Sequence, residues 1–318
     1  MTEQLIREGL LGVGLPLVVA GAILALAWRV WRARAGSPAA HSSAWAGALA
    51  FGAAMIASHI ALNGGVNQKW ERVVYLLIAA GVIGMAAAAA RWTLTQRAKH
   101  AATTTSESVC AGARPGDWLA WVIAAMLTGA AAHFVMAGIF QDGDPTWMRI
   151  AAAGAPVAFA LIMQPLAQRR PGATLPAALT LACFGQAGVL VLSGNQTFAL
   201  IPASLAAASM AAVLVGGAVA LRGGSVSIGS GAMPLASVAL TIPPVLGLLW
   251  VTGLPIAFAW AAGLVAFAPA MLWIGEVGSI ARRGALTRFL IRLALVALPI
   301  AAGLLLAKAN AETDVYFG

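Results

Sequence analysis

Apolar stretches of about 20 residues follow one another along the whole chain, separated by short polar segments. At a helical rise of 1.5 Å per residue, each stretch is long enough to cross a hydrocarbon core about 30 Å thick. The pattern therefore predicts an all-α polytopic transmembrane helix bundle. An eight-span version would require two adjacent segments to be re-entrant or interfacial, so we expect about ten spans. They lie at 9–30, 44–64, 73–93, 118–140, 149–168, 175–193, 197–221, 232–252, 254–275 and 288–308.

The charges between the spans predict the orientation. Fourteen of the 19 basic residues fall in alternate loops, and the other five fall in the remaining loops or near the termini. With the acidic residues included, the first set of loops carries a net charge of +11 and the second −2, which together give the chain's +9. Because lysine and arginine favour the cytoplasmic side, we expect an N-out/C-out topology. Both termini on one side also require an even number of spans.

The composition narrows the function further, since 61% of the residues are hydrophobic and only 9% are charged. Ten spans leave no room for a soluble catalytic domain, so we expect a single integral membrane domain over 1–318. The longest polar segment, 94–117, is rich in serine and threonine and predicts a flexible cytoplasmic loop. The high alanine content and the preference for arginine over lysine favour a bacterial protein of the cytoplasmic (inner) membrane.

The expected partners follow from the same pattern. The lipid bilayer is the first of them, and a homo-oligomer or the subunits of a membrane complex are the others. The basic residues flank the spans and form no stripe or arm, so nucleic acid is not an expected partner despite a pI near 11.

Two segments, 43–93 and 117–168, share features that indicate a duplicated hairpin. In each, a histidine follows 16 residues after a polar residue that can cap a helix, and a glycine follows five residues after the histidine. These histidines are His59 and His133. A W-x-R triplet then opens the next span in both segments.

The matched spacing places His59 and His133 at one depth, near the outer boundary of the membrane. Sixteen helical residues rise about 24 Å, and ionisable groups at such depth usually face a partner or a cavity. Three interpretations stay open: each imidazole bonds a neighbouring group, the pair lines a solute or proton path, or both ligate one haem b iron. Histidine suits all three because it can donate, accept or bind metal near neutral pH.

Further polar side chains predict an outward-facing polar vestibule around the two histidines. The expected lining residues are His59, His133, Asn63, Gln68, Gln141, Asp142 and Asp144. Gln186 lies deeper, near the middle of span 175–193. It either lines a cavity or makes an interhelical hydrogen bond.

Two features concern the other spans. Arg292 lies about one turn inside the last span, where it either snorkels to the interface or pairs with Glu276; in the functional interpretation this pair is a cytoplasmic gate. Pro243-Pro244 is the strongest expected helix break, and such breaks are tolerated where they line protein cavities. We therefore expect a cavity near spans 232–252 and 254–275.

These observations favour a small-solute permease or channel with an outward-facing polar vestibule, for which no cofactor is expected. The alternative is a membrane subunit of a redox or other multiprotein complex, which binds one haem through His59 and His133. An intramembrane enzyme is less favoured, because the chain has no paired-acid motif, no HExxH and no plausible Ser-His-Asp set.

Overall fold

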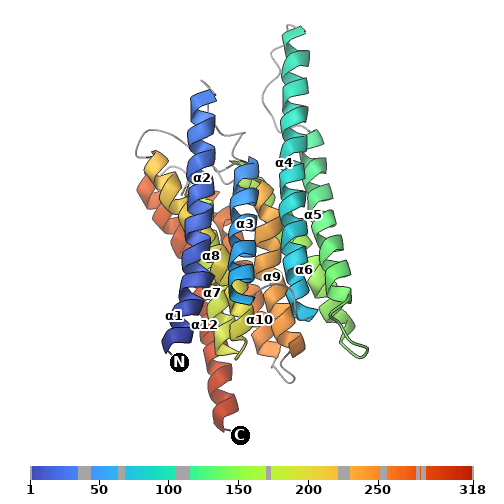
Figure 1. Ribbon diagram of the computed structural model, residues 1–318, viewed down its shortest axis with the longest axis vertical. Coiled ribbons are helices and arrows are strands. Elements are labelled where there is room, and N and C mark those ends of the chain that lie inside the picture. The colour runs from blue at the N-terminus through green and yellow to red at the C-terminus, as the bar shows by residue number, and fades with distance from the viewer. Residues whose placement is uncertain are drawn as a thin grey trace.

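The computed structural model describes residues 2–34, 44–63, 69–104, 115–169, 173–220, 230–250, 256–276, 280 and 284–316. Every regular element within these ranges is a helix (Figure 1). The α-helices are α1 (Thr2–Gly9), α2 (Leu15–Arg34), α3 (Ala44–Asn63), α4 (Val73–Thr104), α5 (Pro115–Ala137), α6 (Thr146–Arg169), α7 (Thr174–Leu192), α8 (Gln196–Ala220), α9 (Met233–Trp250), α10 (Ile256–Ala266) and α12 (Ala285–Tyr316). A π-helical turn, η1 (Leu10–Gly14), joins α1 to α2, and three 3-10 helices are η2 (Lys69–Arg72), η3 (Ser230–Ala232) and η4 (Ala268–Glu276).

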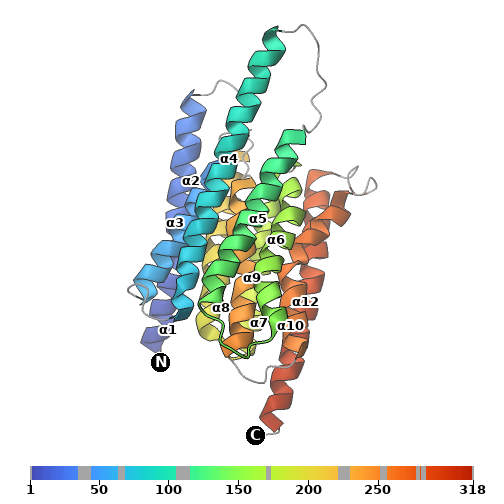
Figure 2. The ribbon, with the colours of Figure 1, turned by 90° about the vertical axis from the view of Figure 1, so that its right-hand side faces the viewer.

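The predicted polytopic helix bundle is confirmed. Within the described residues, nine helices are long and apolar enough to cross a membrane. The pair α10 and η4 adds a tenth if it counts as one span, with a bend of 42° between its two parts. Both chain ends lie at the same end of the bundle (Figures 1 and 2), as an even number of crossings requires. We call the end of the bundle that holds both chain ends the terminal end, and the opposite end of the bundle the loop end.

Helix α9 forms the centre of the bundle. It contacts α3, α4, α5, α6, α7, α8 and α10, and every residue from Met233 to Gly247 is buried. Helices α2 and α12 lie further out: α2 packs on α3 and α8, and α12 packs on α7, α10 and η4. An apolar helix surrounded by other helices is buried on all faces, which agrees with the nearly continuous apolar sequence of α9.

The expected break at Pro243-Pro244 does not occur, because α9 continues as one helix through both prolines. Neighbouring helices pack on all sides of it. The hydroxyl groups of Ser237 and Thr241 donate to backbone carbonyls of the same helix, at 2.6 and 2.7 Å. Such packing and hydroxyl bonds let membrane helices tolerate proline.

The break lies one span later instead, between α10 and η4. Pro269 has no N–H to donate to the preceding turn, and the chain changes to 3-10 bonding, with Ala270 N–H donating to Phe267 O at 2.9 Å. Because α9 is not broken at Pro243-Pro244, the reason for expecting a cavity beside these prolines no longer holds. Residues 251–255, between α9 and α10, lie outside the described part of the chain.

Helix α4 is longer than predicted and continues to Thr104. The first part of the expected flexible loop, 94–104, is therefore helical, because it is rich in residues with high helix propensity such as Ala, Gln, Arg and Lys. Residues 105–114 of that loop lie outside the described part of the chain. In Figure 2 the end of α4 projects beyond the neighbouring helices at the loop end.

Small residues let the helices approach closely. A side chain on Gly129 of α5 would collide with Val157 and with the carbonyl oxygen of Ala153 in α6. Between α7 and α8, Gly194 adopts a positive φ of 79°, and Asn195 N–H donates to Leu190 O at 2.8 Å. This glycine-dependent helix end turns the chain sharply and pairs α7 with α8.

Candidate functional site

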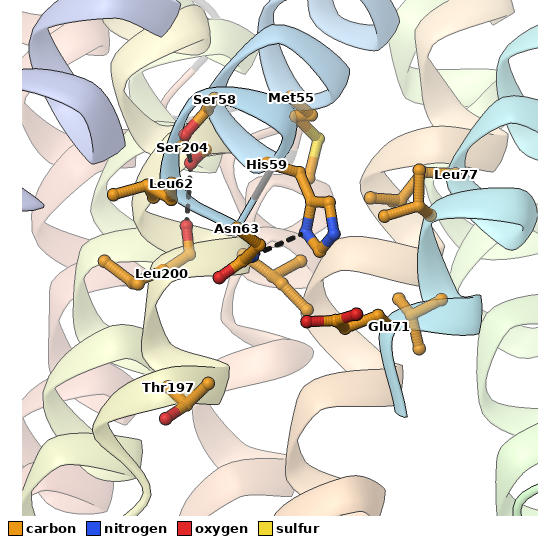
Figure 3. Close-up of a pocket in the computed structure, with 13 residues that line it drawn as sticks. Met55, Ser58, His59, Leu62, Asn63, Glu71, Leu77, Thr197, Leu200 and Ser204 are labelled. Carbon is orange, nitrogen blue, oxygen red and sulfur yellow. Dashed lines mark hydrogen bonds between the residues drawn. The ribbon is translucent and has the colours of Figure 1, made fainter. Parts of the chain in front are cut away.

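A pocket lined by polar and apolar residues opens between α3, η2, α4 and α8 (Figure 3), at the terminal end of the bundle. Its space measures about 460 Å³, part of it open to the surroundings. Helix α3 ends here, whereas α4 and α8 begin here, and the polar lining residues come from α3, η2 and α8. The lining residues are Met55, Ser58, His59, Leu62, Asn63, Glu71, Val73, Val74, Leu77, Thr197, Leu200, Ile201 and Ser204.

One wall of the pocket carries its ionisable groups. His59 and Asn63 lie one turn apart on α3, and their side chains meet with 3.2 Å between Asn63 Nδ2 and His59 Nδ1. Because an amide nitrogen can only donate, Nδ1 accepts, and the proton of a neutral imidazole then lies on Nε2. The carboxylate of Glu71 comes from η2 and lies below the imidazole in Figure 3, and its residue is only 4% exposed.

A chain of hydrogen bonds forms the opposite wall. The hydroxyl oxygens of Ser58 on α3 and Ser204 on α8 are 3.0 Å apart. Ser204 Oγ lies 2.9 Å from Gly12 O and 2.8 Å from Leu200 O, either of which can accept its proton. Gly12 belongs to the π-helical turn of the first span, and such turns often occur at functional sites. Three spans are thus tied together beside the pocket.

Of the residues predicted for the vestibule, the structure brings His59 and Asn63 into this pocket. Gln68 lies outside the described residues. His133 does not line the pocket: it is exposed on α5, with its ring edge-on to Phe134 at 5.9 Å. Helix α4 lies between α3 and α5 and packs on both. The structure therefore does not bring His59 and His133 to one gap, as a shared haem iron would require.

The three predicted residues of the α5–α6 loop lie at the same terminal end but do not line the pocket. Asp144 Oδ2 accepts from the backbone N–H of Gln141 at 2.6 Å, and Arg149 donates to Gln141 O at 2.9 Å. The guanidinium of Arg149 also stacks over Phe140, 5.5 Å from the ring centre. These contacts give Gln141 and Asp144 a role in shaping the loop, while Asp142 is exposed.

The interhelical hydrogen bond that is one of the two interpretations of Gln186 is not formed among the described residues. Gln186 is fully buried in α7, and neither amide atom has a hydrogen-bond partner within the described part of the chain. It is also not one of the pocket residues. Cys183, three residues earlier, is buried as a free thiol.

The loop end of the bundle contains the second charged feature. Arg292 of α12 is 6% exposed, and its Nη2 lies 3.2 Å from Glu276 Oε1 and 3.1 Å from Gly275 O. The sequence left two interpretations of Arg292 open, snorkelling to the interface or pairing with Glu276. The structure shows the ion pair with Glu276. A cavity of about 230 Å³ adjoins it, lined by both charged residues with Leu166, Thr174, Leu175 and Leu272.

Sequence reasoning missed Glu71 as a site residue, together with Ser58, Thr197 and Ser204. Glu71 falls in a short segment between two spans, which suggested a solvated loop, yet η2 returns it into the bundle. Ser58 could have been found, because it precedes His59 in a cluster of polar residues at one end of a span. Ser204 carries no such signal, since a serine in an apolar helix usually bonds its own backbone.

Comparison with protein family models, with curated proteins and with solved structures finds no match for this chain.

Proposed function

We propose that this polytopic membrane protein is a permease or channel for a small solute, with the pocket around His59, Asn63 and Glu71 as its outward-facing binding site. The observation that carries the proposal is a pocket that holds a buried carboxylate, an imidazole and an amide within an otherwise apolar helix bundle. Polar groups at membrane depth are costly, so they usually mark a solute or ion path. The pocket opens at the terminal end, which the charge distribution assigns to the outside.

The Glu276–Arg292 pair supports a closed path at the opposite end. It links η4 to the start of α12 and is largely buried. In a permease of this kind, the pair is a cytoplasmic gate that separates when the pocket closes to the outside. The bend between α10 and η4 gives η4 a hinge about which it can move, as in other transporters with interrupted helices.

The test is solute flux into liposomes that contain the purified chain, measured with a panel of small neutral, cationic and anionic solutes. The proposal expects flux of at least one solute above that of protein-free liposomes. His59→Ala should reduce this flux several-fold, and His133→Ala is the matched control because His133 lies outside the pocket. Equal loss in both variants, or no flux of any solute, would overturn the proposal.

A further inference from the structure

Gln186 lacks the hydrogen bonds that a buried amide normally makes. Its side chain is fully buried in α7, and neither the amide nitrogen nor the amide oxygen has a partner among the described residues. Burying such a group without partners is costly, so an unpaired amide in a folded protein usually marks a bound molecule or a functional role. The groups that lie opposite this amide therefore indicate what it binds.

A contact between α7 and α9 fixes how these two helices are aligned. A Cβ on Gly247 of α9 would lie 3.4 Å from Leu190 Cδ2 of α7. Because α7 and α9 are two spans apart, they run in the same direction, from the loop end to the terminal end. One turn back from the contact on each helix places Gln186 level with Pro243. Gln186 and Leu190 are four residues apart, so they lie on the same face of α7, which packs on α9.

The two prolines of α9 remove the helical donors of two backbone carbonyl groups. In an α-helix each N–H donates to the carbonyl four residues earlier, and proline has no N–H. Pro243-Pro244 therefore frees the carbonyl oxygens of Ala239 and Leu240. The hydroxyl group of Thr241 does not replace either donor, since it donates to Ser237 O at 2.7 Å.

The freed carbonyl groups lie close to the level of the Gln186 amide. Ala239, Pro243 and Gly247 follow one another at intervals of four residues, so they share the face of α9 that packs on α7. Helical side chains lean towards the N-terminus of their helix, which for α7 is the loop end. The Gln186 side chain therefore leans from the level of Pro243 towards the carbonyl of Ala239. The amide does not bond this carbonyl directly, so a molecule between them is required to satisfy both.

We propose that a water molecule is bound between α7 and α9, where it accepts from Gln186 Nε2 and donates to the carbonyl oxygens that the prolines free. Water suits this site because it both donates and accepts, and ordered water is one means by which membrane helices satisfy such carbonyls. Neither α7 nor α9 contains a charged residue that would hold an ion instead. The site would join the central helix to α7, and it does not depend on the proposed permease function.

Radiolytic hydroxyl-radical labelling of the purified chain, read by mass spectrometry, tests for this water. Radicals formed from a bound water oxidise the side chains beside it, even where bulk solvent is excluded. Cys183 is the native reporter, because it is fully buried and lies one turn before Gln186. Gln186→Leu should reduce its oxidation several-fold, while oxidation of Met136, equally buried in α5, should not change. Cys183 oxidation that is absent in the wild type, or equal in both proteins, would overturn the proposal.

Thermal unfolding in detergent is a second test, in which the sign of the change decides. With a bound water, Gln186→Leu removes one of its partners and lowers the midpoint, whereas leucine in place of an unpaired amide would raise it. Pro243→Ala returns a donor to Ala239 O, so Gln186→Leu should cost less in that background. Pro156→Ala, in the interior of α6, is the matched control and should leave the cost unchanged. A raised midpoint, or equal costs in all backgrounds, would contradict the site.

Discussion

At the residue scale, the burial of Arg292 depends on the glycine that it packs against. A side chain on Gly275 would lie 2.6 Å from Arg292 Cγ and 2.9 Å from its Nε, too close for any real contact. The missing side chain leaves the Gly275 carbonyl open to the guanidinium, which then pairs with Glu276. The positions of the charges in the sequence suggested this ion pair. Nothing in the sequence shows that the pair requires a glycine at position 275.

Gly275→Ala should therefore destabilise the protein by about 1–3 kcal/mol, because the methyl group displaces a buried arginine from its partners. The measurement is thermal unfolding of the purified variant in detergent. Gly263→Ala is the control, since Gly263 lies in α10 with nothing within 4 Å of an added Cβ. An equal midpoint for Gly275→Ala and the wild type would show that the ion pair is not held as described.

In the candidate site too, some features could be predicted from the sequence and others could not. His59 and Asn63 were predicted because ionisable and amide groups inside an apolar span are conspicuous. Their separation from His133 could not be predicted, since identical spacing along two helices fixes depth but not the direction in which each residue faces. Helix rotation is set by packing, and the packing of α5 exposes His133.

At the scale of elements, the two proline-containing spans show that a proline's effect depends on its surroundings. Pro243-Pro244 lies in the central helix, which is packed against other helices on all sides and continues through both prolines. Pro269 lies in a span with fewer neighbours, and there the helix breaks. The order and approximate number of the spans could be predicted from hydropathy. The position of the break could not, because the packing around each proline, which the sequence does not reveal, decides whether the helix continues.

The contact between α4 and η3 yields a prediction for helix packing. Gly84 lies against the carbonyl group of Gly231, and an added Cβ would overlap with that oxygen. Gly84→Ala should lower the stability by several kcal/mol, because the obstacle is backbone and cannot rotate away. Thermal unfolding in detergent measures the change. Gly154→Ala, where an added Cβ meets nothing within 4 Å, should be nearly neutral; similar losses in both would contradict the packing.

At the scale of the whole molecule, the charge pattern and the fold agree on which loops share a side. Helices α4 and α6 end, and helix α12 begins, at the loop end of the bundle, opposite the chain termini (Figures 1 and 2). In the sequence, these helix ends carry Arg97, Arg169 and Arg288. The bundle alone does not define inside and outside, so the N-out/C-out orientation rests on the positive-inside rule. It remains a prediction, and it determines which side of the membrane the pocket faces.

Cysteine labelling on intact cells tests this orientation. Asp142→Cys, in the exposed α5–α6 loop, should react with a membrane-impermeant maleimide, whereas native Cys110 should react only after the cells are permeabilised. Cys183 is buried and should contribute little signal in either case. The opposite labelling of the two positions would invert the topology and place the pocket on the cytoplasmic side.

The most direct test of the central claim is to block the pocket while flux is measured. Thr197 lines the pocket and is exposed, so Thr197→Cys in a chain with Cys110 and Cys183 replaced by alanine gives a reactive group at that point. A bulky thiol-specific reagent should then strongly reduce flux of the best-transported solute in proteoliposomes. The same reagent on Thr146→Cys, exposed at the same end but outside the pocket, should leave flux unchanged. Undiminished flux in modified Thr197→Cys would contradict the account.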